Sequence, residues 1–294
     1  MSSEESTGPP WIAYNPDGSM HMGGVPDRLL HHPEMLRRGI KLAGAMSPGV
    51  VFHSIPTEDP QFVVKVVDLD TEELPIYERL LRELKAPRNH TIPCQIYRDG
   101  HPLLIMPYLL PLDSFVLRKC GSLRRLLQIF EELAEGVEFL HQQHIAHLDI
   151  CPNNVVASLS EHVSAHPDSG LVPERTYIID FDTSRQLPLG PGDQHAITLP
   201  PTQLPPPDNL THFDPYSWDI YCLGQVYKAA IRDFSFRRKY SPWVARWCAR
   251  WLTGEERGCH TDVGQPPERY VEYSPSYALR HPPSSFARSC VVVT

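Results

Sequence analysis

The pattern of hydrophobic and polar positions first predicts a group of short β-strands. Residues 39–44, 50–55 and 61–67 are short apolar segments with several β-branched residues, which suits three antiparallel strands. Farther on, residues 95–109 place an Asp-Gly pair between two apolar runs, the pattern of a β-hairpin. These segments predict a small β-rich lobe in the first part of the chain.

A helical spacing of apolar residues then predicts four helices, over residues 71–84, 122–143, 218–231 and 241–254. The third is apolar on nearly all sides, so we expect it to be buried. Two short strands, at 154–158 and 176–181, stand between the second and third helices. The pattern therefore predicts an α+β fold, in which a mostly helical lobe follows the β-rich one.

Proline positions set the expected boundaries. The 31 prolines concentrate in residues 9–56, 187–216 and 266–283, and proline fixes φ and lacks an N–H, which favours loops and connectors. We expect a loosely ordered extension at residues 1–35 and a small lobe at 36–108. A trimmed helical lobe at 109–270 and a Pro-containing tail at 271–294 are expected to follow. A polar segment at 158–176 is expected to be a surface insertion.

Length and charge narrow the class of protein. The 294 residues allow one large domain or two lobes, and an apolar fraction of 41% supplies a sizeable core. The net charge of −8 argues against bulk binding of nucleic acid or of anionic membrane, both of which need a positive field. The longest nearly apolar run, residues 103–112, is too short to cross a bilayer.

Cysteine use and the chain ends favour an intracellular protein. The seven cysteines lack paired close spacing, which is typical of reduced thiols in the cytoplasm or nucleus. The first ten residues are acidic and contain no apolar stretch, so we expect no secretory signal there. Cys290 is fifth from the end, whereas a prenylation box needs it fourth. We expect a monomer whose partner is a protein substrate of unknown identity.

The strongest chemical signal is the pair of segments HLDICPNNVV (147–156) and YIIDFD (177–182). They hold an Asp in a loop, an Asn five residues later and an Asp that ends a strand: Asp149, Asn154 and Asp180. Phosphoryl transfer needs such a set, with an acceptor for the attacking hydroxyl's proton and oxygen ligands for Mg²⁺. Each residue alone is more often a turn residue, but their joint spacing favours a phosphotransfer site.

Here the sequence resembles the protein kinase superfamily. HLDICPNN stands where that family has its H-R-D-L-K-x-x-N catalytic loop, and DFD stands where it has D-F-G. The resemblance covers about residues 38–255 and implies a bilobal fold that binds ATP and Mg²⁺. It gives Asp149 the role of catalytic base and makes Asn154 and Asp180 metal ligands. Lys65, in FVVK, matches the lysine that holds the α- and β-phosphates.

The same resemblance implies a nucleotide pocket in the small lobe. GAMSPGVV (44–51) is similar to the Gly-rich loop, because Gly44, Gly49 and Val51 match it while Met46 replaces the middle glycine. By itself this segment is equally typical of an ordinary hairpin.

Two further parts of the pocket follow from the resemblance. Glu73 is the implied partner of Lys65, and Glu78 is the alternative; a solvated surface carboxylate is the competing interpretation of either. Met106 flanks the implied adenine site, and the backbone around Tyr108, over residues 107–109, faces the base edge. Core packing is the alternative interpretation of this stretch.

Two residues later in the chain have structural roles in this interpretation. WDIYCLG resembles the family's D-x-x-S-x-G helix, which makes Asp219 a structural acceptor beneath the catalytic loop. Asp208 is a weak match for the Glu of A-P-E. Histidines at 141, 144 and 147 lack a fourth ligand for zinc, so a structural role is preferred.

Three departures from the family pattern leave the function open. Leu148 replaces the Arg beside the catalytic Asp, Cys151 replaces a Lys near the transferred phosphate, and Asp182 replaces the Gly of D-F-G. The first interpretation is an active kinase that phosphorylates Ser or Thr of a protein. The alternatives are a pseudokinase scaffold and a small-molecule kinase similar to the aminoglycoside and choline kinases.

Overall fold

A computed structural model describes residues 9–206 and 211–254, which form two compact units. Of these, unit 1 comprises residues 9–84, 92–109 and 158–175. Unit 2 comprises residues 85–91, 110–157, 176–206 and 211–254. Unit 1 is rich in β-sheet and unit 2 is mostly helical, so the predicted α+β fold is confirmed.

Unit 1 is built on a five-stranded antiparallel sheet in the order β3-β4-β5-β7-β6. Its strands are β3 (Leu42–Ser47), β4 (Val51–Ser54), β5 (Phe62–Val66), β6 (Gln95–Tyr97) and β7 (Leu103–Pro107). The helix α3 (Glu73–Arg82) connects β5 to the β6–β7 hairpin. The predicted strands and hairpin therefore form one sheet.

The two faces of this sheet carry different side chains. Cross-strand partners share a face, so Phe52, Val64 and Ile105 point to one side. All three belong to a hydrophobic core that also contains Trp11, Leu29 and Met35. The opposite face carries Lys65 together with Val51 and Met106.

The core explains why the N-terminal segment differs from the loosely ordered extension expected for residues 1–35. From residue 9 onward it forms β1 (Ala13–Tyr14), β2 (Met20–His21), α1 (Asp27–Leu30) and α2 (Pro33–Arg38). Leu29 is 0% exposed and Met35 is 1% exposed, because both cover the apolar face of the sheet. The elements are too short to produce a periodic pattern in the sequence.

The segment at 158–176, expected to be a surface insertion, is mostly exposed or half-buried and also has structure of its own. It contains α6 (Ser160–Ala165), and residues 158–175 cluster with unit 1 although strands of unit 2 flank them. Within unit 1, the His166 ring packs edge-on against Phe62 at 5.0 Å, and His166 Nε2 lies 2.9 Å from the carbonyl oxygen of Gln61. The polar composition of residues 158–176 gives no sign of these contacts in the sequence.

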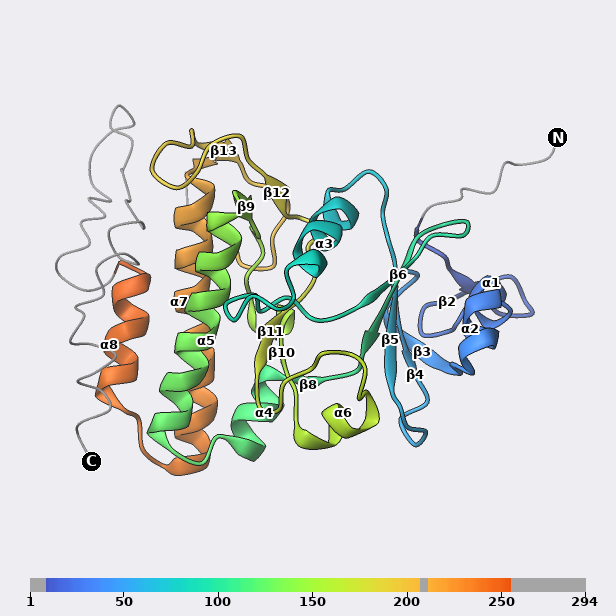
Figure 1. Cartoon of the computed structure of the whole chain (residues 1–294), viewed down its shortest axis with the longest axis horizontal. Helices are drawn as coiled ribbons and strands as arrows, with labels where there is room; N and C mark the ends of the chain where they lie inside the picture. Colours follow the sequence, from blue (N-terminus) through green and yellow to red (C-terminus); the bar gives the residue numbers. More distant parts are fainter. Residues whose placement is uncertain (1–8, 207–210, 255–294) are drawn as a thin grey trace. The chain divides into compact units, whose positions relative to one another are not determined.

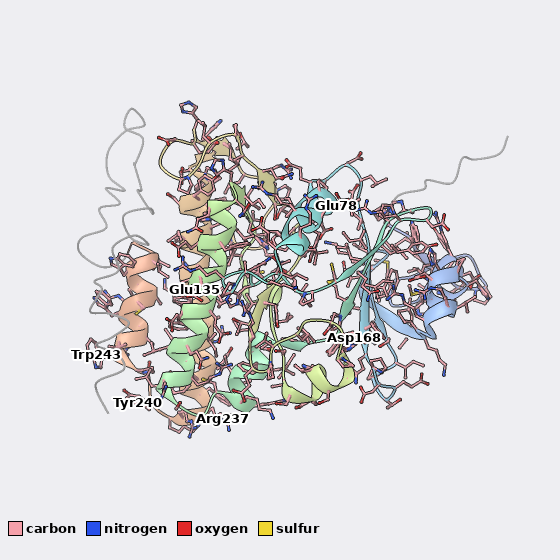
Figure 2. The ribbon with its side chains drawn as sticks, viewed as in Figure 1. Glu78, Glu135, Asp168, Arg237, Tyr240 and Trp243 are labelled. Atoms are coloured by element: carbon pink, nitrogen blue, oxygen red, sulfur yellow. The ribbon has the colours of Figure 1, made fainter. Side chains whose placement is uncertain are left out.

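Unit 2 is organised around the helix α7 (Pro215–Arg238), which packs against three other helices. These are α4 (Leu112–Lys119), α5 (Leu123–Gln142) and α8 (Trp243–Leu252). At the α5–α7 contact, the rings of Phe130 and Tyr227 stack with centroids 3.8 Å apart. Side chains of Arg237, Tyr240 and Trp243 project around the junction of α7 and α8 (Figure 2).

Short strands carry the polar loops of unit 2. The three-stranded sheet has the order β11-β10-β8, from β8 (Leu110–Pro111), β10 (Val155–Ala157) and β11 (Thr176–Ile178). Two further pairs are β9 (Ile145–Ala146) with β12 (Arg185–Gln186), and β13 (Ile197–Thr198) with β14 (His212–Phe213). A single 3₁₀ turn, η1 (Pro152–Asn154), leads into β10.

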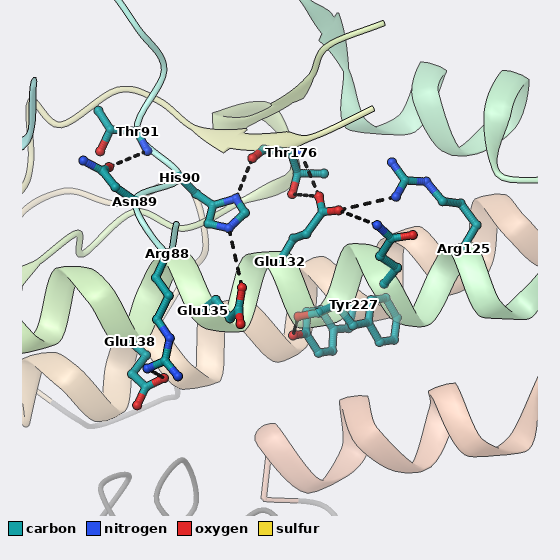
Figure 3. Close-up of polar contacts among 12 residues, drawn as sticks. Arg88, Asn89, His90, Thr91, Arg125, Glu132, Glu135, Glu138, Thr176 and Tyr227 are labelled. Atoms are coloured by element: carbon teal, nitrogen blue, oxygen red, sulfur yellow. Dashed lines mark hydrogen bonds and ion pairs between the residues drawn. The ribbon is translucent and has the colours of Figure 1, made fainter. Parts of the chain in front are cut away.

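A polar network from α5 fixes the start of β11 (Figure 3). The Glu132 carboxylate accepts hydrogen bonds from the Thr176 backbone N–H and hydroxyl, both at 2.9 Å. His90 Nδ1 lies 2.8 Å from the carbonyl oxygen of Thr176. These contacts to three atoms of Thr176 fix the start of β11, the strand that leads to Asp180.

Two parts of the sequence interpretation lie outside the described residues. These are Asp208 and the tail at 271–294. In the part of the chain that the structure describes, every helix is too short or too polar to span a bilayer.

The packing of the N-terminal segment gives a stability prediction. We expect Leu29→Ala to lower the free energy of unfolding by about 2–5 kcal/mol, because it leaves a cavity in the core of unit 1. The neighbouring Leu30 is 42% exposed, so Leu30→Ala should change it by less than about 0.5 kcal/mol. Urea unfolding of both variants measures this difference, and equal values would mean that the segment does not stabilise the fold.

Candidate active site

The candidate residues of unit 1 centre on a buried ion pair. Lys65 Nζ on β5 lies 2.7 Å from Glu73 Oε1 at the start of α3, with the two side chains 6% and 0% exposed. Glu78, the alternative partner, projects from α3 and instead pairs with Arg98 (Figure 2). A buried lysine is retained only with a charged partner, so Glu73 fixes the position of this ammonium group.

The sheet register places the other candidates of this unit around the lysine. Val51 on β4 is the cross-strand partner of Lys65, and the side chain of Met106 on β7 lies on the same sheet face. Met106 is 6% exposed. Lys65 therefore has apolar neighbours on its sheet face, which is the face opposite to the one covered by the N-terminal segment.

The two glycines of the implied phosphate loop have another structural explanation. Gly49 has φ +72°, and a Cβ on it would meet Pro10 Cβ at 2.7 Å. A Cβ on Gly44 would lie 3.2 Å from the carbonyl oxygen of Gly23. Close packing of the N-terminal segment therefore requires glycine at position 49 and favours a residue without a side chain at position 44, whatever else the loop binds.

Tyr108 differs from its expected place in an adenine site. Its backbone N–H donates to the carbonyl oxygen of Gln61 at 3.0 Å, so it does not face a ligand. Pro107 has no N–H to offer. An adenine site at residues 107–109 stays a prediction, and it cannot use a backbone N–H of Pro107 or of Tyr108.

In unit 2, the catalytic-loop motif forms a compact turn between β9 and β10. Asp149 is 6% exposed and Asn154 is 3% exposed. The Asn154 amide group donates to Asp149 twice, to the backbone oxygen at 2.9 Å and to carboxylate Oδ2 at 3.1 Å. These bonds orient the Asp149 carboxylate, and the Asn154 side-chain oxygen accepts a long hydrogen bond from Gln203 Nε2 at 3.4 Å. A cation bound to that oxygen would replace this bond.

Asp219 on α7 holds the loop from beneath, as the resemblance implied. Its carboxylate accepts backbone hydrogen bonds from His147 at 2.8 Å and Leu148 at 2.7 Å. His141 Nε2 lies 3.0 Å from the same carboxylate. Trp218 Nε1 donates to the Leu148 carbonyl oxygen at 2.8 Å. The helix thus binds both backbone groups of the residue that precedes Asp149.

These contacts explain Leu148, where the family has an arginine. Leu148 has φ +67° and its side chain is 0% exposed. The left-handed backbone is stabilised by the bonds to Asp219 and Trp218. An arginine side chain buried in the same way would need a charged partner, so the apolar leucine suits this site.

The strand β11 brings Asp180 to the loop. The Ile179 backbone N–H donates to the Asn154 carbonyl oxygen at 3.0 Å, and His147 Nε2 lies 3.1 Å from the Ile179 carbonyl oxygen. Asp180 follows with φ +69° and is half-buried. The next residue, Phe181, is 0% exposed and packs against the His147 ring at 5.0 Å.

The histidines at 141, 144 and 147 have structural contacts. His141 and His147 bond to Asp219 and to the 179 carbonyl, and the carbonyl oxygen of His144 accepts from Leu187 N–H at 2.8 Å. Among the residues that the structure describes, three or more His, Cys, Asp or Glu side chains never group as a metal site.

The oxygen atoms around Asp180 nevertheless fit magnesium. Mg²⁺ typically takes one or two protein oxygen ligands and completes its shell with water and phosphates. Burial raises the pKa of the Cys151 thiol to about 11, and the Asp149 and Asp180 carboxylates contribute to this rise. The Asn154 amide contacts the Asp149 carboxylate, and the N–H of Ile179, one residue before Asp180, bonds to the Asn154 backbone.

Sequence analysis missed Gln203, which contacts the catalytic-loop motif directly. Its backbone N–H donates to Asp149 Oδ1 at 2.7 Å, and its side-chain Nε2 donates to Asp149 Oδ2 at 3.0 Å. The Asn153 amide donates to Gln203 Oε1 at 2.9 Å. Gln203 lies in a Pro-rich stretch with no periodic signal, so nothing in the pattern points to it.

Comparison with known proteins was made for the whole chain, and no family model matches it. The chain is 27% identical over 137 residues to ribosomal protein S6 kinase alpha-2 of Mus musculus, covering 44% of this chain and 17% of that protein. It is 30% identical over 127 residues to serine/threonine-protein kinase PknD of Chlamydia pneumoniae, covering 40% and 13%. The matches thus span about a sixth of the first relative and about an eighth of the second.

Among solved structures, the Cydia pomonella Granulovirus kinase, PK-1, aligns with a TM-score of 0.41 and 18% identity, covering 69% of each chain. The sequence relatives and the two motifs support a protein-kinase-like domain in this chain.

Proposed function

We propose that this chain is a phosphotransferase of the protein kinase type, which transfers the γ-phosphoryl group of ATP to a Ser or Thr hydroxyl of a protein. One observation carries the proposal: the Asn154 amide orients the Asp149 carboxylate, and the strand leading to Asp180 bonds to the Asn154 backbone. A turn built only for structure has no need of three buried or half-buried oxygen-bearing side chains at one point.

Asp149 is the proposed base. Its carboxylate accepts the proton of the acceptor hydroxyl while that oxygen attacks the γ-phosphorus. The hydrogen bond from Asn154 keeps the carboxylate in one rotamer, and Asp219 keeps the loop backbone in place. These contacts supply the positioning on which phosphoryl transfer mainly depends.

Lys65 is the proposed ligand of the α- and β-phosphates. Its ion pair with Glu73 holds the ammonium group on the sheet face beside Val51 and Met106. An ammonium group is a compact point charge suited to phosphate oxygens, and the apolar neighbours suit a purine ring.

Asn154 and Asp180 are the residues proposed to hold magnesium. Bound there, the cation neutralises charge on the phosphates. The Asn154 orientation supports the assignment, because both amide hydrogen-bond donations go to Asp149 and the oxygen is left as the acceptor. That oxygen accepts a bond from Gln203 Nε2 at 3.4 Å, which a bound cation would replace.

One observation favours the scaffold alternative. The Asp149 carboxylate already accepts bonds from Gln203 and Asn154, which leaves little room for an acceptor hydroxyl. The small-molecule alternative is favoured by Cys151, since a lysine at that position serves protein-phosphorylating members of the family.

Mass spectrometry of turnover mixtures tests the choice among these functions. Purified full-length chain is incubated with ATP, Mg²⁺, a Ser/Thr peptide library and, separately, aminoglycosides and choline. We expect phosphate on Ser or Thr of peptides, and none with the Asp149→Asn variant. Phosphate only on a small alcohol would contradict the protein substrate, and no transfer to any acceptor would favour the scaffold.

A thermal shift tests the nucleotide site without knowledge of the acceptor. Ligand at about 100 times its Kd adds about 2.7 kcal/mol of stability. For a chain of this size we therefore expect ATP with Mg²⁺ to raise Tm by roughly 5–10 °C.

The matched controls are two aspartate variants. Asp180→Asn should remove the Mg²⁺-dependent part of the shift, because it removes a proposed ligand. Asp168→Asn, at an exposed aspartate of the insertion, should keep the full shift (Figure 2). Equal shifts in both variants would take Asp180 out of the metal site.

A further inference from the structure

The stretch that covers Asp149 is a short strap, residues 199–206, of sequence LPPTQLPP, which has no helix or strand and bends at Gln203 and Leu204. It lies in unit 2 with Asp149, and four of its eight residues are prolines. Gln203 is at its centre and is exposed, whereas Asp149 beneath it is 6% exposed. The strap therefore separates the carboxylate from solvent.

The hydrogen bonds of Gln203 occupy the position that an acceptor needs. A carboxylate offers about four lone-pair sites. Gln203 fills two of them at 2.7 and 3.0 Å, and Asn154 fills a third at 3.1 Å. An acceptor hydroxyl must come within about 2.6–3.2 Å of the same oxygens, so it competes directly with Gln203.

The strap is held in this place by contacts on both sides of the glutamine. Asn153, next to the metal ligand Asn154, donates to Gln203 Oε1 at 2.9 Å. Within the strap, the Thr202 hydroxyl donates to the Leu204 carbonyl oxygen at 2.7 Å. The prolines restrict the backbone, so ordering the strap costs little conformational entropy.

We propose that residues 199–206 are a resident pseudosubstrate, with Gln203 at the phosphoacceptor position. The proposal rests on the proposed function, and it names the substrate class: a proline-flanked protein segment with a hydroxyl residue in place of Gln203. Glutamine has an amide and no hydroxyl, so it binds the base without being able to accept phosphate. The enzyme is inhibited until the strap withdraws.

Exchanging the glutamine for serine converts the inhibitor into a substrate. A serine hydroxyl lies close to its own backbone nitrogen, which in residue 203 is 2.7 Å from Asp149 Oδ1. In Gln203→Ser, the new hydroxyl oxygen bonds to the γ-phosphorus of ATP as the bond from that phosphorus to the β-γ bridging oxygen breaks. ADP leaves, and the hydroxyl proton passes to Asp149.

The test is phosphopeptide mapping of the full chain after incubation with ATP and Mg²⁺. We expect Gln203→Ser to carry phosphate at residue 203, in an amount independent of protein concentration because the reaction is intramolecular. The wild type and Gln203→Ser with Asp149→Asn should carry none there. The adjacent Thr202 is an internal control and should stay unmodified.

A second variant tests the inhibition itself. Gln203→Ala removes the side-chain bond to Asp149 and keeps the backbone bond. Peptide phosphorylation should rise at least about tenfold, as expected for loss of a bond to a charged group. A fall in activity would show that Gln203 positions Asp149 for catalysis, and would overturn the proposal.

The two proposals fail in distinguishable ways. A Mg²⁺-dependent ATP shift in Gln203→Ser together with an unmodified residue 203 would overturn the pseudosubstrate and leave the nucleotide site intact. Absence of the ATP shift in the wild type and in both variants would overturn the proposed function and, with it, the pseudosubstrate.

Discussion

The buried Asp219 carboxylate is the contact on which the rest of the site depends. It is 0% exposed and accepts hydrogen bonds from two consecutive backbone N–H groups, those of His147 and Leu148. Leu148 is in the left-handed region, which costs an L-residue roughly 1–2 kcal/mol. Hydrogen bonds to a charged group contribute about 1.5–3 kcal/mol each, so the carboxylate outweighs this cost.

A series of hydrogen bonds connects the Asp219 carboxylate to the other polar residues of the site in unit 2. The loop fixed by Asp219 carries Asp149, the Asn154 amide orients Asp149, and the Asn154 backbone receives the strand that ends at Asp180. Glu132 and His90 hold the other end of that strand. The Asp149 carboxylate oriented in this way also accepts a hydrogen bond from Gln203. The contacts proposed to prepare the carboxylate for catalysis therefore also allow Gln203 to block it.

Much of this could be predicted from sequence because it depends on local spacing. Asp149, Asn154 and Asp180 lie on a short loop and a strand end, and the Lys65 strand leads directly to the Glu73 helix. Gln203 and the core contacts of Leu29 depend on segments far apart in the chain, which hydrophobic periodicity does not connect. Gly44 and Gly49 show a third case: the residue type was noticed, but its packing partners lay outside the motif.

The central claim is that Asp149 accepts the proton in γ-phosphoryl transfer. Its most direct test is a single-turnover measurement with γ-labelled ATP on the full chain and on Gln203→Ala, each with and without Asp149→Asn. The account predicts that Asp149→Asn slows transfer at least about 100-fold, the usual contribution of a general base, while the Kd for ATP stays within about twofold. Equal transfer rates with and without the Asp149 carboxylate would contradict it.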